Sequence, residues 1–188
     1  MKFIAPPSDQ SRKKYYQFTA IDDCTRIRVL RIYDRLNQKT AIQFADYLLD
    51  KLPFRVEAIQ TDNGSEFQSA FHRHLLDHGI GHIYYIKPAT PRLNGKVERS
   101  HRIDGEEFYR QLKGVLIDDT QVFNDKLAEW QDFYNYHRPH GSLGAREWEM
   151  TRYRAYQAQL AGQPIGETFR RATAFLRRAA DGSSLSRT

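Results

Sequence analysis

The chain has 188 residues, which is enough for one domain or for one domain with a tail. A domain of about 150 residues buries roughly 70% of its unfolded surface, so a hydrophobic core can form without disulfides. The single cysteine, Cys24, excludes an internal disulfide framework and fits a reducing compartment. The sequence contains neither a signal peptide nor an apolar run near the ~20 residues that span a bilayer, so a soluble, intracellular protein is expected.

Positive charge is distributed unevenly along the chain. The net charge of +6 favours an anionic partner such as nucleic acid. Residues 145–188 carry eight arginines and four acidic residues, so residues 1–144 contribute only +2. Clustering must therefore create any DNA-binding face in residues 1–144, and the plainer interpretation of residues 145–188 is a solvated, arginine-rich tail.

Short runs of apolar, aromatic and β-branched residues predict the strands. They cover residues 1–4, 15–21, 26–33, 56–59 and 82–86. A turn over Asp22, Asp23 and Cys24 makes the second and third of these runs antiparallel neighbours. The run at 56–59 is flanked by predicted helices, which favours a parallel, buried position for it.

Helical patterns separate the later strands. Asn37 can cap a helix over 39–52 that Pro53 ends, with Ile42, Ala45, Leu48, Leu49 and Leu52 on one stripe. A second helix runs from Ser65 to Gly79, and residues 87–95 are predicted to be a loop. Further helices are predicted over 96–112 and 120–136, the last with an apolar set of Val122, Leu127, Trp130, Phe133 and Tyr134. This order of elements predicts an α/β layer fold with a mixed sheet.

Two acidic residues stand at the ends of predicted elements. Asp62 follows the strand run at 56–59, and Glu98 opens a helical pattern, with 35 residues between them. Open α/β sheets generally form their sites at the carboxyl ends of strands. Carboxylate oxygens suit Mg²⁺ or Mn²⁺, and two such ions about 4 Å apart can activate a water or a 3′-hydroxyl. Asp62 and Glu98 are therefore candidate metal ligands; the plainer interpretation is two surface acids.

Basic residues surround this pair in the sequence. They are Lys87 and Arg92 in the predicted loop and Lys96, Arg99 and Arg102 around Glu98. Such side chains can position a DNA backbone without reading its sequence. Pairing of Glu98 with Arg102 along a solvated helix would explain that pair, but not the cations of the loop.

Four histidines, at positions 72, 74, 78 and 82, suggest a metal site, and His74 and His78 are one helical turn apart. No cysteine or carboxylate lies at ligand spacing from them, which favours a solvated helix face. Trp130, Phe133, Tyr134 and Tyr136 are interpreted as core residues rather than base-stacking groups. Neither a nucleophile elbow nor a phosphate-binding glycine loop is present.

Four motifs together resemble a known family. They are Phe18–Arg26, Gln60–Phe67, Pro91–His101 and Tyr134–Leu143. In this order they are similar to the catalytic core of bacterial insertion-sequence transposases, which is of the retroviral-integrase type. The resemblance covers about residues 1–144, so residues 1–144 are predicted to be the catalytic core and 145–188 a divergent or partly disordered tail.

The resemblance implies a ribonuclease-H-like fold and an Asp, Asp, Glu metal triad. Asp62 and Glu98 match the second and third triad members, including their spacing. It further implies two Mg²⁺ or Mn²⁺ ions and DNA strand transfer by a 3′-hydroxyl. The implied substrates are the DNA of mobile-element ends and a target, within a homo-oligomer and away from membranes. The implied location is the bacterial cytoplasm, in association with the nucleoid.

The beginning of the sequence departs from the family pattern. The family's first Asp stands in the pattern Asp-x-Lys-Phe, and with Met1, Lys2 and Phe3 at the start it would fall immediately before Met1. The first strand is therefore expected to be incomplete and the sheet edge exposed. Asp22 and Asp23 belong to the next turn, and Asp9 is a weak substitute. The upstream helix-turn-helix of such transposases is also absent, and the sequence diverges beyond Gly144.

The sequence therefore predicts a transposase or integrase core, encoded as a fragment with little or no activity. The competing hypothesis is a non-catalytic remnant that binds DNA or other subunits. A stand-alone ribonuclease-H-type nuclease would fit the fold but not the motifs at 91–101 and 134–143.

Overall fold

A computed structural model describes residues 15–23, 25–62, 64–86, 91–112, 119–138 and 172–178, with residues 91–94, 96 and 172–178 described by their backbone alone. Five strands form one mixed sheet in the order β2-β1-β5-β3-β4. They are β1 (Tyr16–Asp22), β2 (Arg28–Tyr33), β3 (Val56–Thr61), β4 (His82–Tyr85) and β5 (Ala172–Arg178).

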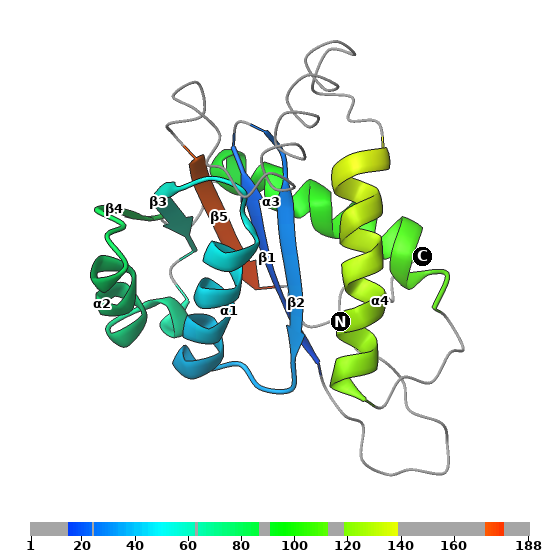
Figure 1. Cartoon of the computed structure of the whole chain (residues 1–188), viewed down its shortest axis with the longest axis horizontal. Coiled ribbons are helices and arrows are strands. Elements are labelled where there is room, and N and C mark those ends of the chain that lie inside the picture. The colour runs from blue at the N-terminus through cyan, green and yellow to red at the C-terminus, as the bar shows by residue number, and fades with distance from the viewer. Residues whose placement is uncertain are drawn as a thin grey trace.

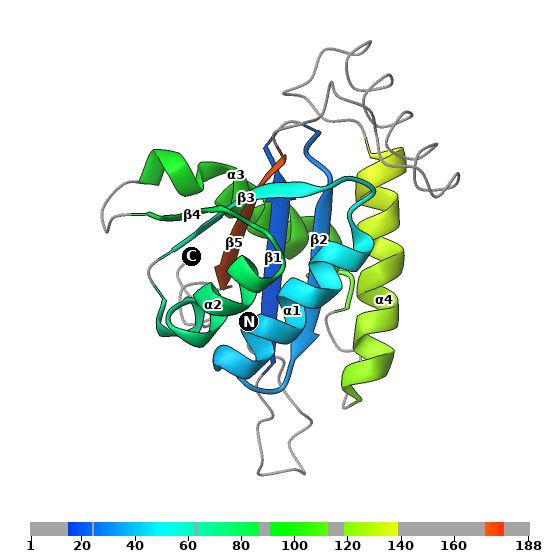
Figure 2. The same cartoon turned by 60° about the vertical axis from the view of Figure 1, so that its left-hand side comes forward.

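Helices cover both faces of the sheet (Figures 1 and 2). The α-helices are α1 (Gln38–Lys51), α2 (Ala70–Asp77), α3 (Pro91–Ile103) and α4 (Thr120–Asp132). Three shorter segments complete the set: the 3-10 turn η1 (Ser65–Phe67) and the π-helical turns η2 (Asp104–Tyr109) and η3 (Phe133–His137). The predicted α/β layer fold with a mixed sheet is thus confirmed for these residues.

The strands β1 and β2 form the predicted antiparallel hairpin. Its turn is held by Asp22, whose Oδ2 accepts hydrogen bonds from the backbone N–H of Thr25 at 2.6 Å and from its hydroxyl at 2.7 Å. Arg26 in this turn has a φ of 62°, and its guanidinium pairs with Asp23 at 2.9 Å. Both acids therefore belong to the turn, as the sequence indicates.

The strand β3 lies between β4 and β5 and runs parallel to both. The prediction of a parallel, buried position for residues 56–59 is therefore confirmed. The expected strand at residues 1–4 lies outside the described residues. The position between β1 and β3 is filled from the other end of the chain, by β5.

No sequence pattern predicted the strand β5. It pairs antiparallel with β1 and parallel with β3, so it lies at the centre of the sheet (Figure 1). A seven-residue segment of the arginine-rich end thus shares a sheet with strands of the first 61 residues. The division of the chain at residue 144 stays a prediction, but this strand connects both parts through backbone hydrogen bonds.

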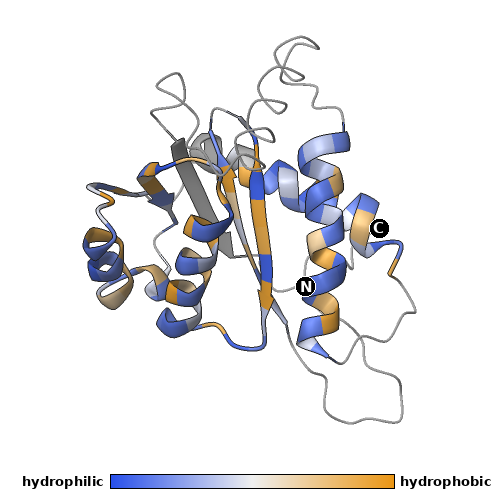
Figure 3. Ribbon diagram, in the orientation of Figure 1, coloured by the Kyte–Doolittle hydropathy of each residue, from blue (hydrophilic) through white to orange (hydrophobic). Residues whose placement is uncertain are grey.

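The face of the sheet below α1 and α2 carries the main hydrophobic core. Phe18 of β1 packs between Phe44 of α1 and Phe67 of η1, with ring centroids 5.4 and 6.2 Å apart. Phe71 and Leu75 attach α2 to the same core. Figure 3 shows hydrophobic colouring over much of the neighbouring strand β2, interrupted by hydrophilic positions. Burying a large apolar side chain stabilises the fold by about 1.5–3 kcal/mol, so this layer fixes α1 and α2.

The predicted cap at the start of α1 and the predicted glycine at the end of α2 are confirmed. The side chain of Asn37 accepts a hydrogen bond from the N–H of Thr40, and the hydroxyl of Thr40 accepts one from the N–H of Asn37. At the end of α2, Gly79 adopts a φ of 77°, and its N–H donates to the carbonyl of Leu76. Glycine tolerates this left-handed conformation because it has no Cβ.

The opposite face combines apolar and polar contacts under α3, η2 and α4. Its apolar cluster includes Leu30, Ile32, Phe123 and Leu127. Beside it, the fully buried guanidinium of Arg28 pairs with Asp104 of η2 at 2.7 Å. The indole of Trp130 in α4 donates to the same carboxylate at 2.7 Å. This buried ion pair joins the sheet, η2 and α4 at one point.

Side-chain amides of α4 and η3 cover the free edge of β2. Asn135 accepts from the N–H of Arg28 at 3.0 Å and donates to its carbonyl at 2.8 Å. Gln131 accepts from Leu30 N–H, and Asn124 bonds both backbone groups of Ile32. An uncovered edge strand invites pairing with another chain. Three amides on one helical stretch here replace the missing neighbour strand.

Several predicted boundaries are wrong. Residues 91–95, expected in a loop, open α3, because proline is tolerated in the first helical turn, where its missing N–H costs nothing. The helix expected from Ser65 is broken at Ser69, whose φ is 46°. The regular helix expected over 96–112 gives way to the π-helical η2 at Asp104.

The predicted apolar sets of two helices are only partly right. In α4 the buried residues are Phe123, Leu127 and Gln131, whereas Val122 and Phe133 are exposed. In α1, Ala45, Leu48 and Leu52 are buried as predicted, but Phe44 and Ala41 take the places expected for Leu49 and Ile42. Of the four aromatic residues predicted to be core, Tyr134 is buried and Trp130 and Tyr136 are partly so.

None of the helices in the described residues is long and apolar enough to cross a membrane.

The amide contacts at the edge of β2 predict that Asn135→Ala lowers the free energy of unfolding. The substitution leaves the buried N–H and C=O of Arg28 without their partner, at a cost of about 1–3 kcal/mol for each buried group. Urea denaturation measures the change. Glu129→Ala, an exposed substitution on the same helix, is the control and should stay within about 0.5 kcal/mol of wild type. Equal effects of the two substitutions would contradict this role of Asn135.

The central position of β5 predicts that Ala174→Pro disrupts the sheet. Ala174 is registered with Asp22 on one side and Ile59 on the other, and proline removes the N–H and restrains the backbone of a central strand. Thermal unfolding should become broad or shift down by many degrees. Ala174→Ser, which keeps the N–H, is the matched control. A proline variant that melts like wild type would place this segment outside the sheet.

Candidate metal and nucleic-acid site

Asp62 comes directly after β3, at the carboxyl end of the strand. The adjoining chain is held in place there, because the N–H of Ile86 donates to the carbonyl of Thr61 at 2.9 Å. The half-buried Asp62 accepts a hydrogen bond from the N–H of Gly64 through Oδ1, at 3.3 Å. A short turn thus holds this carboxylate at the edge where sites of open α/β sheets form.

A second carboxylate, that of Glu66, lies buried in the same turn and was not singled out from the sequence. The residue is only 5% exposed. A Cβ added at Gly64 would lie 2.7 Å from Glu66 Oε2 and 2.8 Å from its Cδ. Glycine at position 64 therefore makes room for the carboxylate. The Asn-Gly-Ser-Glu sequence could have indicated this buried carboxylate, because a glycine two residues before an acid lets the acidic side chain approach the backbone closely.

Glu98 lies on the outer side of α3. Its neighbour Val97 is fully buried against Ile21 of β1, and Ser100 is buried where its hydroxyl accepts from the guanidinium of Arg28 at 2.8 Å. Glu98 itself is exposed. The helix is thus anchored on both sides of Glu98, and the carboxylate remains open to solvent.

The contacts of α3 follow β1 from its end toward its beginning. Val97 meets Ile21, His101 lies 3.0 Å from the hydroxyl of Thr19, and Asp104 accepts from the side chain of Gln17 at 3.0 Å. Two of these contacts are made by α3 and the third by η2, which continues it, so the helix has little freedom to tilt. The position of Glu98 relative to the sheet is therefore fixed by buried contacts.

The register across the sheet relates Asp62 to the strand that supports α3. Thr61 of β3 is paired with position 176 of β5, and position 177 is paired with Thr19 of β1. Asp62, one residue beyond Thr61, is thus level with Thr19 and two strand spacings from it, about 10 Å. His101 contacts Thr19, and Glu98 lies one helical turn before His101. Asp62 and α3 therefore belong to one region of the sheet.

The strand between Asp62 and β1 brings basic rather than acidic residues to this level. Thr19 is registered with Arg177 and Phe18 with Arg178, and β5 contains no acidic residue. Any carboxylate contributed by the sheet between Asp62 and α3 would have to come from this strand. The charge at these two register positions is positive.

The five cations predicted to contact DNA are described to different degrees. Arg99 and Arg102 are exposed on α3 beside Glu98. Arg92 and Lys96 lie on the same helix and are described by their backbone alone, and Lys87 lies outside the described residues. Four of the five positions therefore share α3 with Glu98.

A polar network beneath α3 and η2 stiffens this part of the fold. The hydroxyl of Tyr109 donates to the side chain of Gln17, which in turn donates to Asp104. Burial, together with the negative charge of Asp104, raises the pKa of Tyr109 well above its usual value. Tyr109 therefore remains a neutral hydrogen-bond donor at all physiological pH values.

An ion pair joins η2 to the residue that follows η3. Arg138, after η3, bonds Glu107 of η2 through its Nε at 2.8 Å and through Nη2 at 2.5 Å. The hydrogen bond from Arg138 is the main reason why the pKa of Glu107 lies below its usual value. A two-point contact of this kind fixes orientation as well as charge.

By donor type, Asp62 and Glu98 fit a hard divalent cation. Carboxylate oxygens are the ligands that Mg²⁺ and Mn²⁺ take from proteins, with water and substrate phosphates completing the shell. Asp22 is not placed to join them, because it is registered with position 174 of β5, at the level of Ile59 and three residues before Asp62.

Comparison with known proteins identifies relatives in mobile DNA. The ORF3 protein of Spiroplasma virus SpV1-C74, named as an integrase, is 30% identical over 160 residues, which are 76% of this chain and 43% of the relative. An uncharacterized protein of insertion element IS476 from Xanthomonas euvesicatoria is 31% identical over 142 residues, which are 69% of this chain and 40% of the relative. The chain therefore spans less than half the length of both relatives.

Two solved viral structures share the fold. The intasome of simian T-cell lymphotropic virus, solved in complex with the PP2A regulatory subunit B56 gamma, matches with a TM-score of 0.61 and 19% identity over 73% of this chain and 48% of that chain. The catalytic core domain of BIV integrase matches with a TM-score of 0.56 and 16% identity over 78% of this chain and 88% of that chain. The predicted ribonuclease-H-like fold is confirmed by these similarities.

Two family models match overlapping parts of the sequence. Both are descriptions of an integrase core domain; one covers residues 1–91 and the other residues 79–147. Together they include Asp62, Glu98 and all of α3. The chain belongs to the integrase core domain family.

Proposed function

We propose that this chain is the core of a transposase that acts in DNA integration by metal-dependent strand transfer, and that its own catalytic activity is impaired. In this proposal Asp62 and Glu98 are metal ligands. The exposed Arg99 and Arg102, with Lys87, Arg92 and Lys96, position the DNA backbone.

One observation carries the assignment of the site. Asp62 stands at the carboxyl end of β3, level with Thr19, and the helix that carries Glu98 is fixed to Thr19 through His101 at 3.0 Å. Two carboxylates on rigid elements and a row of cations on the same helix are what metal-assisted phosphoryl transfer on a polyanion requires.

The proposed cofactors are two Mg²⁺ or Mn²⁺ ions, which activate a 3′-hydroxyl and stabilise the leaving oxygen when bound. The part of this chain is to hold the cations through Asp62 and Glu98 and to keep α3 in place through Val97 and Ser100. The proposed substrates are the DNA ends of a mobile element and a target. One matched structure is an intasome, and we propose that this chain also assembles into an oligomer on DNA.

The proposed impairment rests on the charge of β5. Within the sheet, the strand that lies between β1 and β3 contributes no carboxylate to join Asp62 and Glu98. That strand has Arg177 at the level of Asp62 and Arg178 one residue beyond it. An arginine instead of an acid at this register position adds positive charge rather than a ligand, which disfavours the binding of a divalent cation.

A second candidate function follows from the same arrangement. If the cations of α3 bind DNA but no metal ion is held, the chain is a non-catalytic subunit that binds DNA or joins a complex of intact transposases. The exposure of Arg99 and Arg102 favours DNA binding in both cases. The two candidate functions differ in whether the activity of the chain on DNA requires metal ions.

Reversing the charge of β5 tests the metal site and the impairment together. We expect Arg177→Asp to tighten Mn²⁺ binding by about tenfold or more, because each added carboxylate strengthens the attraction of the cation. Titration calorimetry measures the affinity. Arg178→Asp is the matched control. Successive residues of a strand face opposite sides of the sheet, so only one of the two introduced carboxylates can act as a ligand of the same metal ion.

Two outcomes would count against this account. If Arg177→Asp/Asp62→Asn binds Mn²⁺ as tightly as Arg177→Asp, Asp62 is not a ligand. If the unaltered chain carries out Mg²⁺-dependent strand transfer that Asp62→Ala abolishes, the impairment is refuted while the site is supported.

The cations of α3 predict salt-sensitive DNA binding. We expect Arg99→Ala and Arg102→Ala each to lower the slope of log K against log salt concentration by about 1, because each phosphate contact releases about one counterion. Fluorescence anisotropy with a labelled duplex measures the slope. Arg110→Ala, an exposed change beyond η2, is the control and should leave the slope unaltered. Binding that persists fully in EDTA would favour the non-catalytic subunit, and unchanged slopes would exclude α3 as the DNA-binding element.

A further inference from the structure

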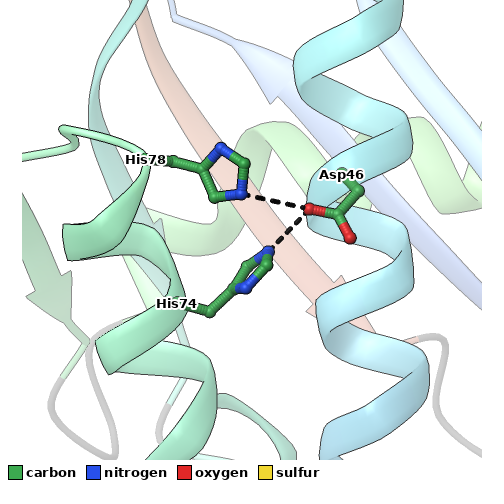
Figure 4. A group of neighbouring side chains, drawn as sticks. All are labelled: Asp46, His74 and His78. Carbon is green, nitrogen blue, oxygen red and sulfur yellow. Dashed lines mark hydrogen bonds and ion pairs between the residues drawn. The ribbon is translucent and has the colours of Figure 1, made fainter.

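A second group of metal-ligating side chains lies on the other side of the sheet from α3. It consists of Asp46 on α1, His74 on α2 and His78, which caps the C-terminus of α2 (Figure 4). The two histidines alone favour a solvated helix face, because a third ligand is missing from their own helix. The tertiary structure supplies that ligand from α1.

The three side chains converge on one point. The Nε2 atom of His74 lies 2.6 Å from Asp46 Oδ1, and the Nε2 atom of His78 lies 3.5 Å from the same oxygen. The two imidazole rings are 4.5 Å apart between centroids. Figure 4 shows both rings directed from α2 toward the carboxylate on α1. The potential ligand atoms all lie within 4.8 Å of one another.

These separations suit a small cation. Bonds of about 2.0–2.2 Å from zinc to nitrogen and oxygen put the ligand atoms of a tetrahedral site about 3.3 Å apart. The observed 2.6 and 3.5 Å lie on either side of that value, so only small side-chain rotations are needed. The side chains are 26–50% exposed, which leaves room for such rotations and for a water molecule as fourth ligand.

The helices that carry the ligands are held at a fixed distance. His74 and His78 are four residues apart, so they project from one side of α2. On the adjoining part of the same side, α2 packs through Phe71 and Leu75 into the core that also contains Phe44 and Leu48 of α1. The ligands therefore come from two elements whose separation the hydrophobic core sets before any ion binds.

The donor set selects the kind of metal. Two imidazole nitrogens and one carboxylate oxygen suit Zn²⁺ and neighbouring d-block ions, whereas Mg²⁺ prefers oxygen donors throughout. The group is also separate from Asp62 and Glu98, because α1 and α2 cover one face of the sheet and α3 covers the other (Figures 1 and 2).

We propose that Asp46, His74 and His78 form a binding site for Zn²⁺ that cross-links α1 and α2. The ion takes the place of the hydrogen bond between imidazole and carboxylate, and each neutral imidazole then carries its proton on Nδ1 so that Nε2 is free to bind the ion. It joins two helices that the apolar core already holds together. The site is independent of strand transfer and of the proposed ions at Asp62 and Glu98.

Metal titration of the full chain, without an affinity tag and after treatment with EDTA, tests the proposal. We expect Zn²⁺ to bind with one equivalent at this site and, at a hundredfold excess over its Kd, to raise the melting temperature by about 5–10 °C. Co²⁺ should give the visible absorption bands of a tetrahedral site. Mg²⁺ at the same concentration should have the same effect on wild type as on Asp46→Asn.

Single substitutions separate the site from adventitious binding. Asp46→Asn, His74→Ala and His78→Ala should each weaken Zn²⁺ binding by about tenfold or more and remove the Co²⁺ bands. His82→Ala, which removes an exposed histidine of β4, is the matched control and should bind Zn²⁺ like wild type. All four positions are on the surface, so the metal-free variants should fold.

Two results would overturn the proposal. One is Zn²⁺ binding and thermal stabilisation that Asp46→Asn and His78→Ala leave unchanged, which would mean adventitious binding elsewhere. The other is the absence of any Zn²⁺-dependent shift in the wild-type melting temperature. In that case the three side chains form only a hydrogen-bonded surface cluster.

Discussion

The guanidinium of Arg28 is the contact on which the arrangement of α3, η2 and α4 depends. It is fully buried, 2.7 Å from Asp104, 2.8 Å from the hydroxyl of Ser100 and 3.4 Å from the ring centroid of Tyr134. Removing one partner of such a buried pair leaves an uncompensated charge, which is far costlier than the loss of a surface pair. All four residues must therefore be in place together. Because Ser100 lies two residues after Glu98, the same contact fixes the helix that carries the candidate ligand.

The two faces of the sheet are stabilised in different ways. Below α1 and α2 the contacts are apolar and centred on Phe18, whereas below α3 and α4 they are mixed, with Gln17, Thr19 and Asp104 buried among aromatic rings. An apolar layer tolerates small shifts of its helices. A hydrogen-bonded layer does not, since each displaced donor or acceptor would be left unpaired. The face that carries the candidate ligand Glu98 is thus the one with directional contacts.

The parts of the fold that were predicted correctly from the sequence depend on local interactions. Asn37 caps α1 through a residue three positions away, and Gly79 ends α2 through its own backbone conformation. The parts that were missed depend on distant partners. The buried stripe of α4 includes Gln131 because the edge of β2 needs an acceptor, and a polar residue carries no hydrophobic signal. The carboxylate of Asp46 is separated by 28 residues from the histidine that it contacts.

The sequence by itself determined the order of most strands and helices, the family and the two candidate ligands Asp62 and Glu98, because short-range patterns and motif spacing encode them. Only the tertiary structure decided that β5 lies between β1 and β3. A run of Ala, Thr, Phe, Leu and Arg is compatible with many positions, and its place depends on which backbone groups remain unpaired elsewhere. The same holds for the strand position at the level of Asp62. That position is residue 177, more than a hundred residues away in the chain, because hydrogen bonding across the sheet brings the two strands together.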